Sequence, residues 1–259
     1  MIEPWLTFLS VWALTYALVF GSYLAFGWAF TVWARGRGER KIQPRRDGLK
    51  RRDAEIRASA RSLVVTCACF AGGLTLATYG VRLFDAASLS WWSAPLMFAA
   101  SVVLFDAWFY AVHRLAHTAP FKRWHLLHHQ SVAPTVWSNY SDTAFDAFTQ
   151  QGYFLAMPLL TPFPVEVFVV HRVFDHFNGM IGHSGYEVAA GPASRAPWPL
   201  ASVTFHDMHH ATFSTNYANH FSFWDRVFGT IHPDYDRRMA VWEAPAAAPA
   251  EALRGRSHS

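Results

Sequence analysis

The amino-acid sequence predicts an all-α protein, an integral membrane helical bundle. Of its 259 residues, 52% are hydrophobic and 17% are aromatic, which is a high share for a soluble domain. Three stretches contain no charged residue, at 5–33, 62–81 and 86–105. Each is close to the roughly 20 residues that cross a bilayer core as a helix. We therefore expect each stretch to be a membrane-spanning helix.

Residues 1–34 are predicted to form the first transmembrane helix and to stay as a membrane anchor. Trp5 and Trp33 stand at the two ends of the apolar run, where amphipathic rings prefer the headgroup zone of a bilayer. The first four residues lack a positive leader, and the apolar run is too long for a cleaved signal peptide.

Residues 35–61 are predicted to form a basic cytoplasmic loop. Between Arg35 and Arg57 there are ten Lys or Arg and four acidic residues, an excess of +6, so the rest of the chain, whose total is +4, carries −2. The positive-inside rule places such a loop in the cytoplasm, next to anionic lipid. Because one loop holds the excess charge, we expect no nucleic-acid partner.

A cytoplasmic loop puts the N-terminus outside, so the second helix runs outward and the third returns. The third helix is predicted to continue past the membrane, because polar residues recur at steps of 4, 3 and 4 and so share one face. These residues are Asp106, Tyr110, His113 and His117. A hairpin should follow, because the apolar run that starts at Ala147 is broken by two prolines within 161–164 before the chain returns to His183.

The C-terminal part of the chain is predicted to contain little regular structure. Residues 187–202 have the composition of a loop, and residues 233–259 are expected to be a polar, disordered tail, because they are charged and then rich in Ala and Pro. Cys67 and Cys69 lie two residues apart in an apolar helix and predict neither a disulfide nor a redox motif.

Three histidine clusters stand out in this chain. They read His-Arg-Leu-Ala-His at 113–117, His-Leu-Leu-His-His at 125–129 and His-Asp-Met-His-His at 206–210, and they hold eight of the 14 histidines. On a helix, such spacings put the rings on one face. A structural zinc takes about four ligands, so eight histidines suggest two ions. We therefore predict a cytoplasmic helical cap carrying a histidine-rich dimetal site.

The setting narrows the choice of metal, because imidazole alone suits zinc, copper, nickel and iron. A site held against a bilayer meets lipid substrates that offer mainly C–H bonds. Zinc is redox-inert and cannot activate oxygen to break such a bond, whereas a pair of irons can. The chain contains no Glu-x-x-His, so the carboxylate-bridged site of soluble di-iron bundles is disfavoured.

The order and spacing of the clusters resemble those of the fatty acid hydroxylase and sterol desaturase superfamily of membrane histidine-box oxygenases. Asn216-Tyr217 and the run Phe-Trp-Asp-Arg-Val-Phe-Gly-Thr at 223–230 look like its closing signature, and the match covers about residues 100–232. His183-Ser184-Gly185-Tyr186 and His206-Asp207 look closest to the C4-methylsterol oxidase and sterol desaturase branch.

The resemblance implies nine histidine ligands. They are His113, His117, His125, His128, His129, His183, His206, His209 and His210. His176 is a tenth candidate, because it lies seven residues before His183, two turns up the same helix face. Carboxylates close in sequence are expected to orient the rings through hydrogen bonds. They are Asp106, Asp142, Asp146 and Asp207. No catalytic residue beyond the ligands is expected, and Asp225 with Arg226 should lock the fold.

The resemblance further implies that residues 62–232 form an oxygenase domain in which two iron ions use O2 and two electrons to hydroxylate or desaturate a lipid. The lipid would be sterol-like or fatty acyl. The chain has no GxGxxG and no CxxCH, so the electrons should come from a ferredoxin, a cytochrome b5-type protein or a reductase. The expected location is a bacterial inner membrane, or the ER membrane in a eukaryote, with the histidines facing the cytoplasm.

Two other classes of protein remain open at this point. A zinc-dependent membrane hydrolase normally needs a glutamate beside its histidines, as in HExxH, and this motif is absent from the chain. A metal transporter should carry its histidines within the spans. In this chain the clusters follow the predicted spans instead.

Overall fold

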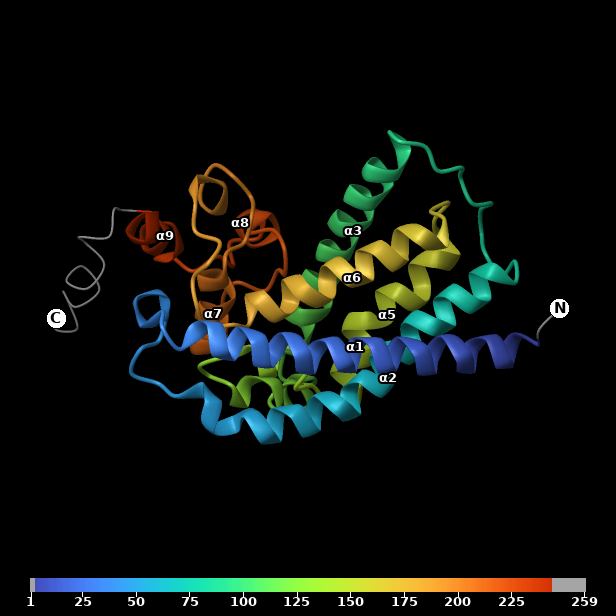
Figure 1. Cartoon of the computed structure of the whole chain (residues 1–259). Helices are drawn as coiled ribbons and strands as arrows, with labels where there is room; N and C mark the ends of the chain where they lie inside the picture. Colours follow the sequence, from blue (N-terminus) through green and yellow to red (C-terminus); the bar gives the residue numbers. More distant parts are fainter. Residues whose placement is uncertain (1–2, 244–259) are drawn as a thin grey trace.

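The computed structural model describes residues 3–243, and in this range the protein is helical without a β-strand (Figure 1). The five long helices are α1 (Pro4–Ala34), α2 (Arg52–Thr78), α3 (Ser93–Ala116), α5 (Ala144–Leu160) and α6 (Val165–Gly182). The short helices are α4 (Lys122–His125), α7 (Val203–Thr212), α8 (Phe223–Val227) and α9 (Tyr235–Glu243). Single 3-10 turns are η1 (Gly38–Arg40), η2 (Gly48–Arg51), η3 (His128–Gln130), η4 (Val136–Ser138) and η5 (Pro192–Ser194).

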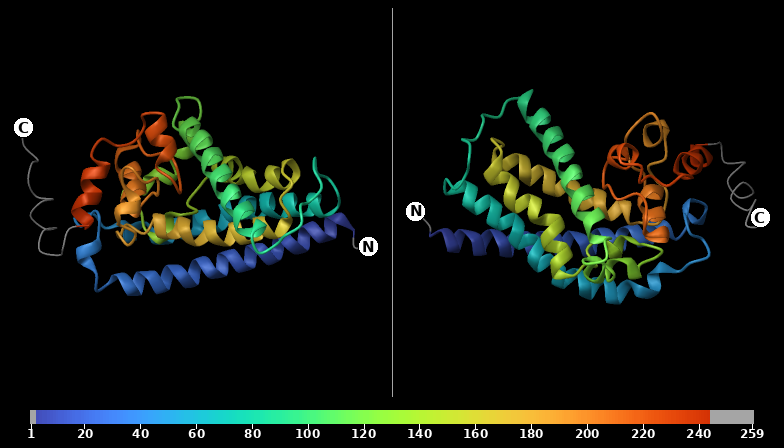
Figure 2. Two further views of the ribbon diagram at one scale, coloured as in Figure 1. Left: turned by 90° about the horizontal axis from the view of Figure 1, so that it is seen from above. Right: turned by 180° about the vertical axis from the view of Figure 1, so that it is seen from behind.

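The long helices form one bundle, and the short helices gather at one end of it. Helices α1, α2, α5 and α6 run side by side, whereas α3 crosses the bundle at a steep angle (Figures 1 and 2). Helices α7, α8 and α9 lie at the end of the bundle where α1 stops, opposite the N-terminus of α1. This end also receives the C-terminus of α3, so segments far apart in sequence meet there.

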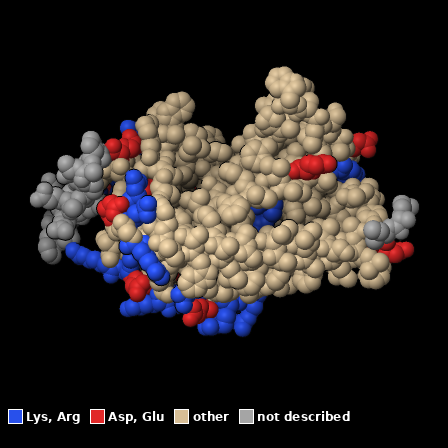
Figure 3. Space-filling view, viewed as in Figure 1, with Lys and Arg blue, Asp and Glu red and all other residues tan. Residues whose placement is uncertain are grey.

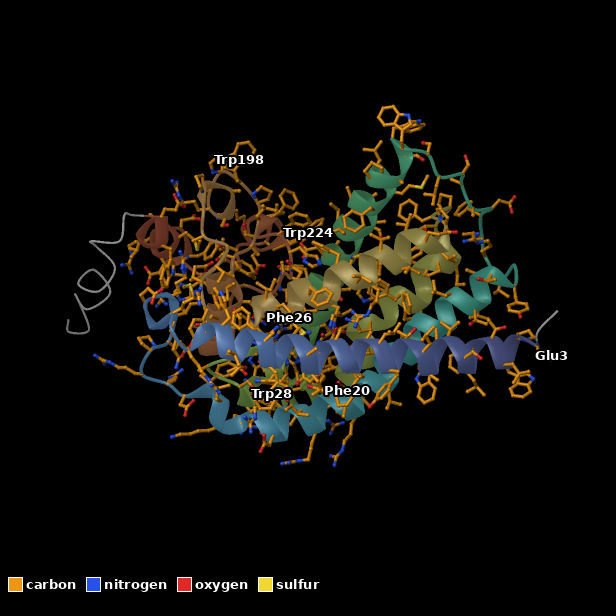
Figure 4. All side chains as sticks on the ribbon, viewed as in Figure 1. Glu3, Phe20, Phe26, Trp28, Trp198 and Trp224 are labelled. Carbon is orange, nitrogen blue, oxygen red and sulfur yellow. The ribbon has the colours of Figure 1, made fainter. Side chains whose placement is uncertain are left out.

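Three helical segments are long and apolar enough to cross a membrane. They are Pro4–Ala34, Gly48–Thr78 and Ser93–Ala116, as the three charge-free stretches predicted. In α1 only Tyr23, Gly27 and Ala34 are buried, and large apolar side chains are exposed, among them Leu18 at 62% and Trp28 at 45% (Figure 4 labels Trp28). An apolar surface of this extent is stable against lipid and not against water.

The structure corrects the predicted boundaries of two segments. The third span begins at Ser93 and not at residue 86, because residues 86–92 run as an irregular segment that leads into the helix. The basic loop ends at Arg51 and not at residue 61, because the charged residues from Arg52 onward already form the first turns of α2. Glu55 in this stretch is buried and accepts hydrogen bonds from Ser131 and Thr135, a tertiary contact that local composition does not reveal.

The C-terminal segment is also partly folded, so the prediction of a disordered tail from residue 233 is wrong for its first part. Residues Tyr235–Glu243 form α9, and Tyr235 and Met239 are fully buried beside Phe205 of α7. Two buried side chains one turn apart are enough to dock a short helix. The remainder of the predicted tail, residues 244–259, lies outside the described residues.

The predicted hairpin is confirmed, and a glycine sets how closely it packs. Helices α5 and α6 are joined by the proline-containing break at 161–164. Within α5, Pro158 has no N–H to donate to the carbonyl of Phe154. Gly73 of α2 faces this carbonyl so closely that a Cβ there would lie 2.1 Å from the oxygen. The α2–α5 contact therefore depends on a residue without a side chain.

We predict opposite outcomes for two adjacent glycines of α2. Alanine is better than glycine in a helix by about 0.5–1 kcal/mol. Gly72→Ala should therefore be neutral or slightly stabilising, because its Cβ would meet side-chain atoms of Leu155 and Phe8 and no backbone. Gly73→Ala meets backbone and should destabilise the protein by about 1–3 kcal/mol. Thermal unfolding of the purified protein in detergent measures both, and an equal response would contradict the packing argument.

Candidate metal centre

Nine buried or partly buried histidines converge at the end of the bundle in two adjacent groups. The first group is His113, His117, His125, His129 and His209. The second group is His128, His183, His206 and His210. Within each group, the candidate ligand nitrogens all lie within 4.8 Å of one another. The structure thus brings together all nine histidines that the family resemblance implied.

Four separate segments supply these rings. The first cluster ends α3, with His117 as the C-terminal cap, and the third cluster lies within α7, as the spacing predicted. The second cluster is not one helix: α4 ends at His125, a turn follows, and η3 starts at His128. This break sends His128 and His129 to different groups. His183 caps the C-terminus of α6 and joins the second group.

The facing atoms in the first group are Nε2 nitrogens. His129 lies at the centre, with its Nε2 3.0 Å from that of His125 and 3.1 Å from those of His117 and His209. His113 Nε2 lies 3.1 Å from His125 Nε2. Two nitrogens about 2.1 Å from one metal are roughly 3.0 Å apart at a right angle and roughly 3.4 Å apart at the tetrahedral angle. The first group therefore fits ligands at right angles around one ion.

The second group repeats this arrangement with four rings. His206 Nε2 lies 2.9 Å from His183 Nε2 and 3.0 Å from His210 Nε2. His128 completes the group, with its Nε2 3.3 Å from that of His183. The rings of His129 and His210 are 4.9 Å apart between centroids, so the two groups share a boundary.

The other ring nitrogen, Nδ1, fixes the protonation of several of these histidines. It lies 2.7 Å from the carbonyl oxygen of Tyr217 in His113, 2.7 Å from that of Thr215 in His209, and 2.8 Å from that of Gly179 in His183. A carbonyl oxygen only accepts, so Nδ1 must carry the proton and a neutral ring then presents a bare lone pair at Nε2.

Bare lone pairs facing one another at about 3 Å repel, and a cation between them removes the repulsion. This donor set therefore fits a metal ion in each group. Burial, reinforced by neighbouring imidazoles, lowers the pKa of His117 and of His183 to about 3. Burial also lowers the pKa of His206, His209 and His210 far below the ordinary value. Neutral imidazole is the form that binds metal.

Two of the four predicted carboxylates contact histidine rings of the centre. Asp142 Oδ1 lies 2.9 Å from His128 Nδ1, and Asp146 Oδ1 lies 3.3 Å from His125 Nδ1. Both contacts leave Nε2 of the ring free to face the metal position.

The other two carboxylates do not contact the histidine groups, contrary to the prediction. Asp106 accepts from the backbone N–H groups of Asn219 and His220, and Asp207 accepts from Gln43. Asp106 and Asp207 are close to the histidines in sequence, but their positions on the helices turn them away from the rings.

His176 also lies outside both groups, so the structure does not bring the tenth candidate to the centre. Its Nδ1 is 2.8 Å from the hydroxyl of Tyr140, and its Nε2 is 3.0 Å from that of Ser22. His171 is likewise hydrogen-bonded elsewhere, through Ser101. Two turns up a helix is about 10 Å of rise, which takes His176 out of reach of His183.

The loop between α7 and α8, which includes part of the predicted closing signature, supplies two of the three carbonyl partners, those of Thr215 and Tyr217. Asp225 is fully buried and accepts from the backbone N–H groups of Tyr217 and Ala218 and from the hydroxyl of Thr230. These bonds hold the segment whose carbonyl orients His113. Asp225 thus locks the fold as predicted, whereas Arg226 pairs with Asp236. The backbone carbonyls themselves carry no residue-type signal and could not be found from sequence.

A small polar cavity of about 30 Å³ lies between the histidines and the bundle. Histidines of both groups line one side of this cavity: His113, His125, His128, His183 and His206. Its other wall includes Gln151 of α5 and Asp175 of α6. A water needs about 10–15 Å³, so the cavity has room for O2 or a pair of waters.

The fold and the histidine groups define the class of this protein: a membrane-helix bundle with a two-part histidine centre at one end. The family model for fatty acid hydroxylase matches residues 98–230. The chain therefore belongs to the fatty acid hydroxylase family. No solved structure matches the chain significantly.

Several curated proteins that are similar to this chain have the names of sterol enzymes. The chain is 33% identical over 132 residues to methylsterol monooxygenase 1 of Gallus gallus, an alignment that covers 49% of this chain and 43% of the relative. It is 26% identical over 209 residues to the cholesterol 25-hydroxylase-like protein of Danio rerio, covering 74% and 82%. It is 28% identical over 184 residues to cholesterol 25-hydroxylase of Mus musculus, covering 61% and 59%. The chain thus spans less than half of the first relative.

We predict that one histidine from each group is essential for metal retention. His128→Ala and His209→Ala should each lower the metal bound per chain by about one ion or more, because each removes a donor from one of the two groups. Elemental analysis of the purified protein measures this directly. His176→Ala is the matched control, since it removes an equally buried imidazole that lies outside both groups. Equal metal loss in all three variants would contradict the assignment.

Proposed function

We propose that this protein is a membrane-bound di-iron oxidoreductase that uses O2 to hydroxylate or desaturate a C–H bond of a sterol-like or fatty acyl lipid. The observation that carries this proposal is the pair of histidine groups with Nε2 atoms 2.9–3.3 Å apart, because it fits two ions side by side. Membership of the fatty acid hydroxylase family and the sterol-enzyme names of the relatives support the lipid substrate.

The chain's own residues would bind and orient the ions and keep bulk water out. The nine imidazoles supply the nitrogen donors. Backbone carbonyls hold the proton on Nδ1 of His113, His183 and His209, and carboxylates contact Nδ1 of His125 and His128. Iron, when bound, supplies the reduction of O2 that oxidation of an unactivated C–H bond requires. The cavity that both groups line is large enough for O2, which favours reaction at this position.

The proposed reaction consumes two electrons, so it requires an electron-donating partner. Hydroxylation converts R–H, O2, two electrons and two protons into R–OH and water, and desaturation yields an alkene and two waters from the same inputs. The sequence contains no flavin, nicotinamide or haem motif, so a ferredoxin, a cytochrome b5-type protein or a reductase would donate the electrons. The basic segment at the histidine end supports a cytoplasmic position for this end of the bundle (Figure 3).

We expect one lipid class to change in an oxygen-dependent way when the protein is present. Membranes from cells with and without the gene, supplied with 18O2, should differ by a lipid that gains one labelled oxygen or loses two hydrogens. Mass spectrometry of total lipids measures both outcomes. Cells producing His209→Ala serve as the control and should match the cells without the gene. An unchanged lipid profile with the iron-loaded protein and its reductant present would contradict the proposal.

A further inference from the structure

A second and larger cavity, of about 190 Å³, lies at the membrane-surface end of α1, apart from the histidine rings. Three segments wall it: the end of α1 with the basic segment that follows, the loop at 133–136, and the loop at 184–186. These segments are bonded together, since Ile42 N–H donates to the carbonyl of Gly185 at 3.0 Å. The cavity is therefore a place where the basic segment folds back onto the protein.

Two glycines allow the walls to approach closely. A Cβ at Gly48 would lie 2.2 Å from the carbonyl oxygen of Ala133, and a Cβ at Gly185 would lie 2.6 Å from that of Pro134. Gly185 also has a φ of +72°, which side-chain-bearing residues rarely adopt. The cavity is thus formed by specific close contacts and not by a loose loop lying over the surface.

The lining carries an excess of positive charge. Four basic side chains, Arg35, Lys41, Arg46 and Arg52, line it beside two carboxylates, those of Asp47 and Asp207, which leaves a net charge of +2. Arg52 pairs with Asp53, but the other three form no ion pair with any described residue. Arg46 is instead bonded to the side chain of Gln43, and Lys41 to a backbone carbonyl. Basic side chains gather at this end of the molecule in Figure 3. Such a cluster attracts an anion, and Arg matches phosphate best.

A buried acceptor faces the same cavity. Asp207 is only 1% exposed and lines the cavity, and one of its oxygens accepts from Gln43 while the other, Oδ2, has no partner among the described residues. A buried polar atom without a partner is costly, so a ligand that brings an O–H or N–H donor would satisfy it. Trp28 and Phe30 add an apolar wall on the α1 side (Figure 4 labels Trp28).

We propose that this cavity binds the headgroup of a membrane phospholipid that carries both a phosphate and an N–H or O–H donor. The phosphate lies among the basic side chains, the donor reaches Asp207, and the acyl chains leave along the apolar surface of α1. The shared chemistry is that of a phosphate ester, which a soluble phosphate ester would also offer. The lipid is favoured because the basic and apolar walls meet at the end of a membrane helix.

Native mass spectrometry of the full chain in detergent tests the proposal. The probes are dioleoyl phosphatidylglycerol and phosphatidylethanolamine, whose headgroups carry O–H or N–H donors, and phosphatidylcholine, whose headgroup has none. The first two should bind about tenfold tighter than the third. The double variant Arg35→Gln/Arg46→Gln should weaken binding of phosphatidylglycerol about tenfold or more, since each basic side chain at the surface contributes about 1 kcal/mol.

The matched control is Arg45→Gln/Lys50→Gln, which removes the same charge from two exposed residues of the segment that do not line the cavity. Its affinity should stay within about twofold, because neither side chain lines the cavity, whereas Arg35 and Arg46 do. Arg35→Lys/Arg46→Lys should retain binding, which separates loss of charge from misfolding. Equal weakening in both glutamine pairs would show a diffuse charge effect and overturn the site. Glycerol-1-phosphate binding as tightly as phosphatidylglycerol would overturn the lipid assignment.

Discussion

Mutual repulsion of imidazole lone pairs is the constraint around which this structure is arranged. Nine Nε2 atoms meet in two groups, and their nitrogens lie as close as 2.9 Å. Such packing is stable only if positive charge lies between the rings. Backbone carbonyls behind the rings hold the proton on Nδ1 in His113, His183 and His209, which leaves their Nε2 lone pairs directed at the neighbouring rings.

The membrane helices bring the segments that carry the histidines together at one end of the bundle. Helix α3 ends in the first cluster, α6 ends in His183, and the glycine contact between α2 and α5 sets the width of the bundle. Inside this bundle, Arg172 is paired with Asp175 and hydrogen-bonded to Tyr140. Buried charges are tolerated in such surroundings when they are paired and hydrogen-bonded. This polar layer adjoins the small cavity, so the centre is polar on the bundle side as well.

Two cavities of different size and lining lie at this end of the bundle. The small one is lined by both histidine groups and is large enough for O2 or a pair of waters. The larger one lies at the membrane surface and is basic with one buried acceptor. Asp207 follows His206 directly in α7 and lines only the larger cavity, so one helix contributes to both sites.

The sequence by itself determined the helical membrane architecture and the members of the centre. Charge-free runs of bilayer length are stable as membrane-spanning helices, and eight histidines in three short windows are typical of a metal-binding site. These features are local, so they can be recognised without coordinates. The hairpin after Ala147 was predictable for the same reason, since two prolines interrupt a helix wherever they stand.

Only the tertiary structure decided how the histidines divide and which neighbours orient them. The turn inside the second cluster sends His128 and His129 to different groups, and no helical periodicity predicts it. His176 shares a helix face with His183, but its ring contacts the hydroxyl groups of Tyr140 and Ser22. It lies too far from His183 along the helix axis to join the histidine groups. Docking of α9 and the burial of Glu55 also depend on partners far away in sequence, and such contacts leave no mark in local composition.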